Sequence, residues 1–264
     1  MIGQTKILDW VDSNIENFPH FIIIVGERGS GKTTLSKVIA NRLNANFAVS
    51  GIKVDEIREV INTAYNVKDT SLYCVKDADT MRNEAKNAML KITEEPPKNA
   101  YFIMTVEDDS TLLDTIKSRS FVFYMEPYSE SELRSYFLEA HENEDADIDF
   151  VCDMATTPYE VDKLIEYGKD FIDYVNLVID NVALVEPANA FKSGKQLALK
   201  GEEGYDLKIF FRTFMLMCLY RLPADDVTIS KYIIATSPYL SKVSKLGVNK
   251  QQLYDSWVFE IRSL

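Results

Sequence analysis

Residues 26–33 read Gly-Glu-Arg-Gly-Ser-Gly-Lys-Thr, and they directly follow the short apolar run Phe21–Val25. This stretch fits the phosphate-binding pattern GxxxxGK[ST] (Walker A) at every fixed position. The apolar run predicts a buried strand, and residues 33–43 predict a helix that begins where the loop ends. A glycine-rich loop between a strand and a helix N-terminus offers backbone N–H groups to an anion. The sequence therefore predicts a site for a nucleoside triphosphate.

Two residues of the loop have individual predicted roles. Lys32 is expected to reach the β- and γ-phosphates, and Thr33 to hold magnesium through its hydroxyl group. We expect ATP or ADP as the ligand, with Mg²⁺ carried by the nucleotide and held weakly. The complete nucleotide-binding set predicted from the motif is Gly26, Arg28, Gly29, Ser30, Gly31, Lys32, Thr33 and Thr34.

Short β-rich runs alternate with helical patterns through the first half of the chain. The predicted strands are residues 21–25, 47–49, 72–75, 101–106 and 121–124. Such alternation predicts an α/β fold, a five-stranded parallel sheet covered by helices on both faces. One of these helices, predicted over residues 81–92, carries an apolar stripe that we expect to face the core, with Arg82, Lys86 and Lys91 on its exposed side.

Strand patterns end near Glu126, and helical patterns continue from there. Ser129-Glu130-Ser131-Glu132 reads as a helix start with a serine cap. Further helices are predicted over residues 171–179, 207–222 and 251–261. We expect three domains: a nucleotide-binding core over residues 1–125, a small helical domain over 126–178, and a second helical domain over 179–264.

Composition limits the class of protein. The chain has 264 residues, 46% of them hydrophobic, and a formal net charge of −12. That acidity opposes DNA binding by the chain alone, since DNA-binding proteins usually present a basic face. The three cysteines lie far apart among apolar residues and predict buried thiols and no zinc site. With no secretory signal pattern and no run long enough to span a bilayer, we expect a cytoplasmic protein.

The acidic residues that should accompany a phosphate loop are incomplete. The predicted strand at residues 72–75 is followed by Lys76-Asp77-Ala78-Asp79. An active ATPase of this class usually has a magnesium-binding aspartate here, often followed by a glutamate that activates water. Only Asp77 stands where two adjacent acids are expected, so it is the candidate either for water activation or for magnesium.

Four further stretches carry a resemblance, in a fixed order along residues 1–125. They are Gly3-Gln4, residues 52–59, residues 89–97 (Met-Leu-Lys-Ile-Thr-Glu-Glu-Pro-Pro) and Ser118-Arg119-Ser120. Together with the phosphate loop, this set resembles the clamp-loader AAA+ family, and most of all the delta-prime subunits of bacterial DNA polymerase III. Residues beyond 125 agree with the family only in length and helical texture.

The resemblance implies a P-loop AAA+ core, a helical lid and an all-helical C-terminal collar domain that joins a hetero-oligomer. It implies that Arg119 is an arginine finger, which reaches the γ-phosphate of a neighbouring subunit. The implied partners are other clamp-loader subunits, a sliding clamp, and primed DNA through the assembled complex, with a role in DNA replication.

Three departures from the family pattern argue against strong hydrolysis. In one register Lys76 replaces the magnesium aspartate and Asp77 the catalytic glutamate, and in the other Asp77 binds magnesium and Ala78 is in the catalytic place. Glu107 takes the position of a polar sensor residue, and no sensor arginine is found around Thr157-Pro158-Tyr159. Delta-prime members often carry degraded catalytic motifs, so the resemblance accommodates these losses.

Three functional hypotheses remain, in this order. The first is an assembly subunit that binds ATP or ADP with weak or no hydrolysis. The second is an active AAA+ ATPase motor, which the intact loop favours and Lys76 and Glu107 oppose. The third is a small P-loop kinase. Its acceptor site would need polar or charged lid residues, whereas the second half reads as packed helices, and the Ser118–Ser120 box has no place in this hypothesis. Whether the chain is an enzyme is left open by its sequence.

Overall fold

The computed structural model describes residues 2–142, 144, 146–181, 204–221, 227–243 and 248–264. These residues fall into two compact units: those within 1–140 and 156–159, and those within 141–155 and 160–264. The elements of the first unit are α1 (Thr5–Ser13), η1 (Ile15–Asn17), β1 (Phe21–Val25), α2 (Lys32–Arg42), β2 (Asn46–Ser50), α3 (Val54–Asn66), β3 (Ser71–Val75), η2 (Ala78–Thr80), α4 (Asn83–Glu94), β4 (Ala100–Val106), η3 (Asp109–Thr111), α5 (Asp114–Lys117), β5 (Phe121–Tyr124) and α6 (Glu130–Ala140).

The five strands pair in parallel in the order β2-β3-β4-β1-β5. The α/β prediction is confirmed, and all five predicted strands are present, β1 and β5 with the predicted bounds. Strand β1 lies between β4 and β5. The next strand along the chain, β2, lies at the edge of the sheet beyond β4 and β3, so the strand order changes direction beside β1. The crevice beside such a change of direction, at the carboxyl ends of the strands, is where open α/β sheets bind ligands.

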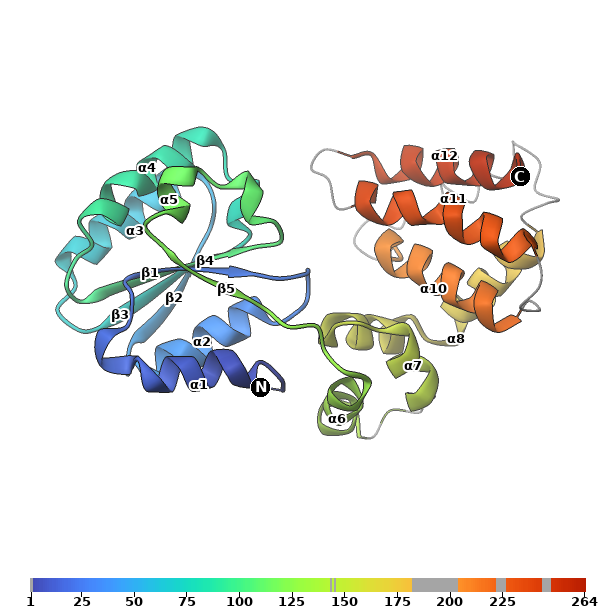
Figure 1. Ribbon diagram of the computed structural model, residues 1–264, viewed down its shortest axis with the longest axis horizontal. Helices are drawn as coiled ribbons and strands as arrows, with labels where there is room; N and C mark the ends of the chain where they lie inside the picture. Colours follow the sequence, from blue (N-terminus) through green and yellow to red (C-terminus); the bar gives the residue numbers. More distant parts are fainter. Residues whose placement is uncertain (1, 143, 145, 182–203, 222–226, 244–247) are drawn as a thin grey trace. The chain divides into compact units, whose positions relative to one another are not determined.

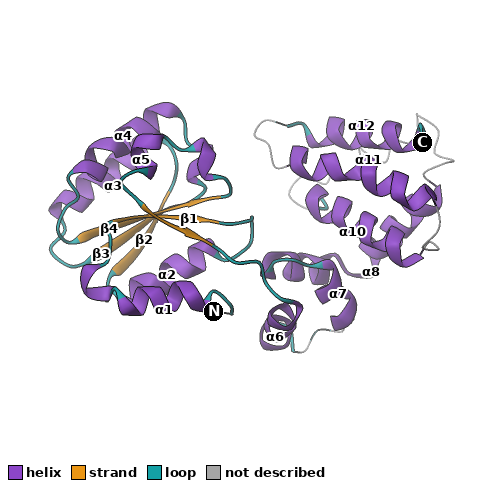
Figure 2. Ribbon diagram, in the orientation of Figure 1, coloured by secondary structure: helices purple, strands orange, loops and turns teal. Residues whose placement is uncertain are grey.

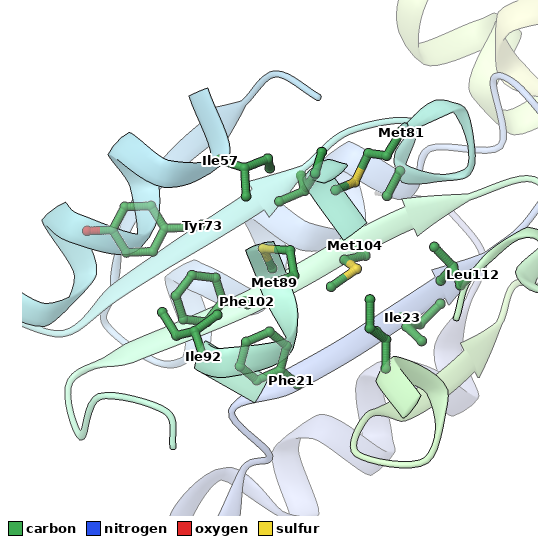
Figure 3. Packing of buried hydrophobic residues seen from close by; sticks show 14 of the residues in the cluster. Phe21, Ile23, Ile57, Tyr73, Met81, Met89, Ile92, Phe102, Met104 and Leu112 are labelled. Atoms are coloured by element: carbon green, nitrogen blue, oxygen red, sulfur yellow. The ribbon is translucent and has the colours of Figure 1, made fainter. Parts of the chain in front are cut away.

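Alternate residues of each strand face opposite sides of the sheet. Phe21, Ile23 and Val25 pack with α3 and α4 in one apolar cluster, whereas Ile22 and Ile24 pack with α1 and α2 in another. Figures 1 and 2 show the sheet as a central layer between these helix pairs, and Figure 3 shows the first cluster from close by. Burial on both faces explains why the strands read as continuous apolar runs.

Helix α4 begins at Asn83, two residues later than predicted, because Met81 and Arg82 have extended backbones. The expectation that Lys86 lies on the exposed side of this helix is wrong. Its side chain is 6% exposed, and its Nζ donates a hydrogen bond to the Thr111 carbonyl oxygen at 2.6 Å. Lysine can bury its aliphatic stem while its ammonium group finds a polar partner.

Helix α6 begins with the cap that the sequence predicts. Ser129 Oγ accepts a hydrogen bond from the Glu132 N–H at 3.3 Å, and Glu132 Oε2 accepts one from the Ser129 N–H at 2.8 Å. This reciprocal pair is a capping box, which satisfies N–H groups that the helix itself leaves without partners. The last strand and the first helix after the sheet are thus joined through a short, defined connection.

Among the described residues of the second unit, all regular secondary structure is helical, as the helical patterns of the sequence predict. Its core gathers aromatic side chains around Phe210 and Trp257, whose ring centroids lie 5.4 Å apart. A buried ion pair joins Arg212 to Glu160. No helix among the described residues is long and apolar enough to cross a membrane. The elements are α7 (Ile148–Met154), α8 (Pro158–Asn181, with a non-helical Gly168), α10 (Leu207–Arg221), α11 (Val227–Val243) and α12 (Lys250–Arg262).

Candidate nucleotide-binding site

A cavity of about 900 Å³ opens at the carboxyl edge of the sheet, within the first unit. Pockets for small ligands usually fall between about 300 and 1,000 Å³. The wall is built from the phosphate loop, from the ends of β2, β3 and β4, and from the start of α8. Its lining residues are Arg28, Gly29, Gly31, Lys32, Thr33, Thr34, Val49, Ser50, Gly51, Ile52, Lys76, Asp77, Asp79, Thr80, Thr105, Glu107 and Tyr159.

Six of the eight predicted nucleotide-binding residues line this cavity, and the other two support the loop. Gly26 extends the sheet, since its N–H donates to the Val106 carbonyl oxygen at 3.1 Å. Ser30 is buried, with its Oγ 3.3 Å from Met125 Sδ. The loop thus has a supported base and an open side that faces the cavity.

Two glycines give the loop its shape. Gly29 and Gly31 have φ angles of +79° and +89°, in the left-handed region that side chains disfavour. Gly31 is also the N-cap of α2, and its carbonyl oxygen accepts the first helical hydrogen bond, from the Leu35 N–H at 2.8 Å. The positive end of the helix dipole therefore lies at the cavity wall, where it favours an anion.

Lys32 is the first residue of α2, and its side chain reaches back to the start of the loop. Its side chain is 7% exposed, and its Nζ donates to the carbonyl oxygens of Gly26 at 2.7 Å and Glu27 at 2.8 Å. These hydrogen bonds compensate the buried ammonium group for the loss of contact with water. The amine is consequently held at the cavity wall on a flexible stem, from which a phosphate could recruit it.

The acidic side of the cavity follows β3 and β4. Asp77 has a left-handed backbone with φ of 54°, and its N–H donates to Thr105 Oγ1 at 3.1 Å. Asp79 Oδ2 accepts a hydrogen bond from the Glu107 N–H at 3.4 Å. Lys76 lies beside Asp77 on the same wall. The pKa of the buried Cys74 thiol is raised, first by desolvation; Asp77 adds to the rise, and a hydrogen bond with Ser36 and the charge of Lys76 oppose it.

The sequence reasoning missed Thr105 and two tyrosines. Thr105 is a buried polar residue inside an otherwise apolar strand, and that contrast was the available signal. The Tyr128 hydroxyl donates to the Ser30 carbonyl oxygen at 2.7 Å. The Arg28 guanidinium carbon lies 5.4 Å from the centroid of the Tyr159 ring, within reach of a cation–π contact.

Arg119 lies outside this cavity. One guanidinium nitrogen donates to the Thr115 carbonyl oxygen at 2.9 Å, and another lies 3.1 Å from Glu94 Oε1. The side chain is 39% exposed. The Ser118-Arg119-Ser120 box thus contacts the end of α4, the helix that leads into the Glu-Glu-Pro-Pro stretch.

The N-terminal Gly3-Gln4 stretch folds against the segment that follows the sheet. The Gln4 amide donates to the Glu126 carbonyl oxygen at 2.8 Å and accepts from the Glu126 N–H at 2.9 Å. Gly3 lies against Tyr128 and Glu132. The Gly3-Gln4 stretch therefore lies near the phosphate loop through Tyr128, but Gln4 is outside the cavity wall.

The donors for a metal ion are few. Across the described parts of the chain, no group of three or more His, Cys, Asp or Glu side chains could hold a metal ion. In nucleotide sites, Mg²⁺ is usually bound by one or two protein ligands together with the phosphates. Thr33 and Asp77, both on the cavity wall, could supply such a pair only with nucleotide present.

Comparisons with known proteins find subunits of DNA polymerase III. A family model described as the delta subunit of DNA polymerase III matches residues 45–129. The DNA polymerase III subunit gamma of Buchnera aphidicola from Schizaphis graminum is 25% identical over 169 residues, covering 52% of this chain and 47% of that protein. The delta-prime subunit of Yersinia pestis is 32% identical over 79 residues, covering 29% and 23%. The chain thus spans less than half the length of these relatives.

Solved structures agree on the fold. A DNA polymerase III gamma subunit-related protein from Thermotoga maritima has a TM-score of 0.57 at 17% identity and covers 97% of this chain and 98% of its own. The Thermotoga maritima RuvB Holliday junction branch migration motor also reaches 0.57, at 16% identity, covering 98% of this chain and 87% of its own. With the family match and the gamma and delta-prime relatives, these results confirm the resemblance of this chain to the clamp-loader AAA+ family.

Proposed function

We propose that this chain is a clamp-loader-type subunit in DNA replication, which binds ATP or ADP and hydrolyses it weakly or not at all. The observation that carries the proposal is the cavity at the sheet edge. Lys32 and Thr33, the first two residues of α2, line its wall. A glycine-rich loop, a helix N-terminus and a lysine together suit a polyphosphate. The relatives named as DNA polymerase III subunits support the replication role.

Weak hydrolysis is proposed from the residues after β3. Asp77 is the only acid directly following the strand, and Lys76 precedes it on the cavity wall. Two unit charges about 4 Å apart interact by roughly 4 kcal/mol at an effective dielectric of 20. The ammonium group of Lys76 therefore repels a magnesium ion at this position. Asp77 is then the one carboxylate directly after β3 for both magnesium binding and water activation.

We also propose that Arg119 acts in trans as an arginine finger. Its exposed position outside the chain's own cavity supports this role, and its contacts with Thr115 and Glu94 keep it at one place on the surface. In the proposed organisation, residues 1–125 bind nucleotide, 126–178 form a lid and 179–264 form a collar. The collar would join other clamp-loader subunits, and the assembled ring would act on a sliding clamp and primed DNA.

The first experiment measures binding and turnover of ATP by the purified chain. We expect saturable binding of a non-hydrolysable ATP analogue and turnover close to that of the buffer. Lys32→Met should weaken binding about tenfold or more, because charge-assisted hydrogen bonds are worth about 1.5–3 kcal/mol. Lys37→Met, on the exposed side of the same helix, is the matched control. Steady turnover that disappears in Asp77→Ala would instead establish the active ATPase motor.

The second experiment tests Arg119 in the assembled complex. Arg119→Ala should lower the ATP turnover of the complex about 10³-fold, the lower end for an arginine finger, without changing nucleotide affinity of the isolated chain. Arg58→Ala, which removes an exposed arginine of α3, is the control. Unchanged turnover in Arg119→Ala would refute the role in trans.

A further inference from the structure

A lysine lines the cavity directly before Asp77, at the end of the strand where a nucleotide site ordinarily keeps its metal-binding acid. Lys76 is the first residue after β3, and its N–H lies 3.4 Å from the Ser50 carbonyl oxygen, so its backbone is fixed at the sheet edge. Its side chain is exposed and lines the cavity with Lys32 and Thr33. Within the described part of the chain, Lys76 forms no ion pair. Its positive charge is therefore available to a ligand in this cavity.

The position of Lys76 relative to α2 follows from the residues between them. Cys74, two residues earlier on β3, is buried next to Ser36 of α2 and is close enough to Lys76 to respond to its charge. Ser36 Oγ in turn donates to the Lys32 carbonyl oxygen at 2.9 Å. Lys76 lines the same cavity as Thr33, which belongs to the first turn of α2, the turn that faces the phosphates in the proposed binding mode.

The donor set fits a divalent ion poorly at this place. Asp77 is the single acid that directly follows β3, and the cavity acids do not gather into a cluster of three, as judged over the described residues. A lysine ammonium offers three hydrogen-bond donors and a full positive charge. It can therefore neutralise phosphate oxygens in the way that Mg²⁺ does, while repelling the ion itself.

We propose that the Lys76 ammonium supplies the counter-charge for the nucleotide phosphates, so that this cavity binds a nucleoside di- or triphosphate without a divalent cation. The inference rests on the proposed function, since it concerns how the same site holds its nucleotide. Binding and metal-dependent hydrolysis are thereby separated: the chain keeps its nucleotide when Mg²⁺ is absent. A subunit of this kind holds nucleotide as a structural ligand.

The test is calorimetric titration of the full chain with ADP and with a non-hydrolysable ATP analogue, in excess Mg²⁺ and in excess EDTA. For the wild-type chain, the two Kd values should agree within about twofold. Lys76→Met should weaken binding in EDTA about tenfold, through the loss of a charged hydrogen-bond donor. Lys76→Asp should make binding depend on Mg²⁺ by about tenfold or more, because it restores a second acid. Lys37→Met should match the wild type.

The possible outcomes separate this inference from the function on which it rests. Wild-type binding that occurs in Mg²⁺ and is lost in EDTA would overturn the inference and leave nucleotide binding intact. Wild-type affinity in Lys76→Met under EDTA would also overturn it. No binding in either buffer would refute the nucleotide site itself. Because Lys76 is exposed, its variants should keep the circular dichroism spectrum and melting profile of the wild type.

Discussion

The substitution Gly29→Ala tests the packing of the phosphate loop against the start of α8. A Cβ atom added to Gly29 would lie 2.2 Å from Tyr159 Cβ and 2.8 Å from its Cγ, closer than real contacts allow. The φ angle of +79° adds backbone strain. Gly31 supplies the comparison, because its φ is +89° but its nearest neighbour is the Tyr128 hydroxyl at 3.4 Å. Both variants share the backbone cost, and only the first has the clash.

The magnitudes follow from these two contributions. A non-glycine residue in the left-handed region costs about 1–2 kcal/mol. Overpacking a tight contact adds about 1–3 kcal/mol. We therefore expect Gly29→Ala to lower the free energy of unfolding of the first unit by about 2–5 kcal/mol, and Gly31→Ala by about 1–2 kcal/mol.

Urea unfolding followed by ¹⁹F NMR of fluorotryptophan-labelled protein measures this directly. Trp10 reports on the first unit and Trp257 on the second, so the two transitions are separated. In a Tyr159→Ala background, the extra cost of Gly29→Ala over Gly31→Ala should vanish. Equal costs for the two glycine variants in the wild-type background, or an excess that persists without the Tyr159 ring, would refute the reasoning.

Three further predictions concern other parts of the chain. Arg212→Met should destabilise the second unit by about 3–5 kcal/mol in urea unfolding, because it takes the charged partner from the buried Glu160; a cost below about 1 kcal/mol would contradict it. Ser129→Ala should cost about 1 kcal/mol and Ser129→Gly a few tenths, in the same assay, since alanine cannot cap α6; the reverse order would exclude the cap. Burial raises the pKa of Tyr174 to about 12, so as the pH rises this hydroxyl loses its proton in the unfolded chain before it does so in the folded chain. Stability should be full below the ordinary tyrosine value near pH 10 and fall by at most about 1.4 kcal/mol per pH unit towards pH 12, and Tyr174→Phe should remove part of that fall.

The phosphate loop and the five strands could be predicted because their signals are local. Each strand is a short apolar run, and the loop between Val25 and Lys32 has a fixed spacing. The strand order could not be predicted in this way. Strand β1 pairs with β4 and β5, from which it is separated by most of the domain, and only packing of the finished sheet decides that arrangement.

Two features, the burial of Lys86 and the contact of Thr105, could not be predicted because they depend on residues distant in the sequence. Spacing along α4 placed Lys86 on the exposed side, but it could not show that the Thr111 carbonyl oxygen would be present to receive its ammonium group. Similarly, the motif spacing points to Glu107 as the sensor position and gives no role to Thr105, whose hydroxyl oxygen accepts a hydrogen bond from the Asp77 N–H. In both cases the deciding partner lies some 25 residues or more away in sequence, beyond the reach of any local pattern.

The paired hydrogen bonds between Gln4 and Glu126 have a consequence for the architecture of the chain. They bring the two ends of the sheet-containing domain side by side, with all five strands between them. A domain whose ends meet can be cut at an exposed loop and rejoined through a short linker with little entropic penalty. The sheet-containing part of the chain is thus organised as a closed module, which can tolerate circular permutation or serve as an insert within another polypeptide.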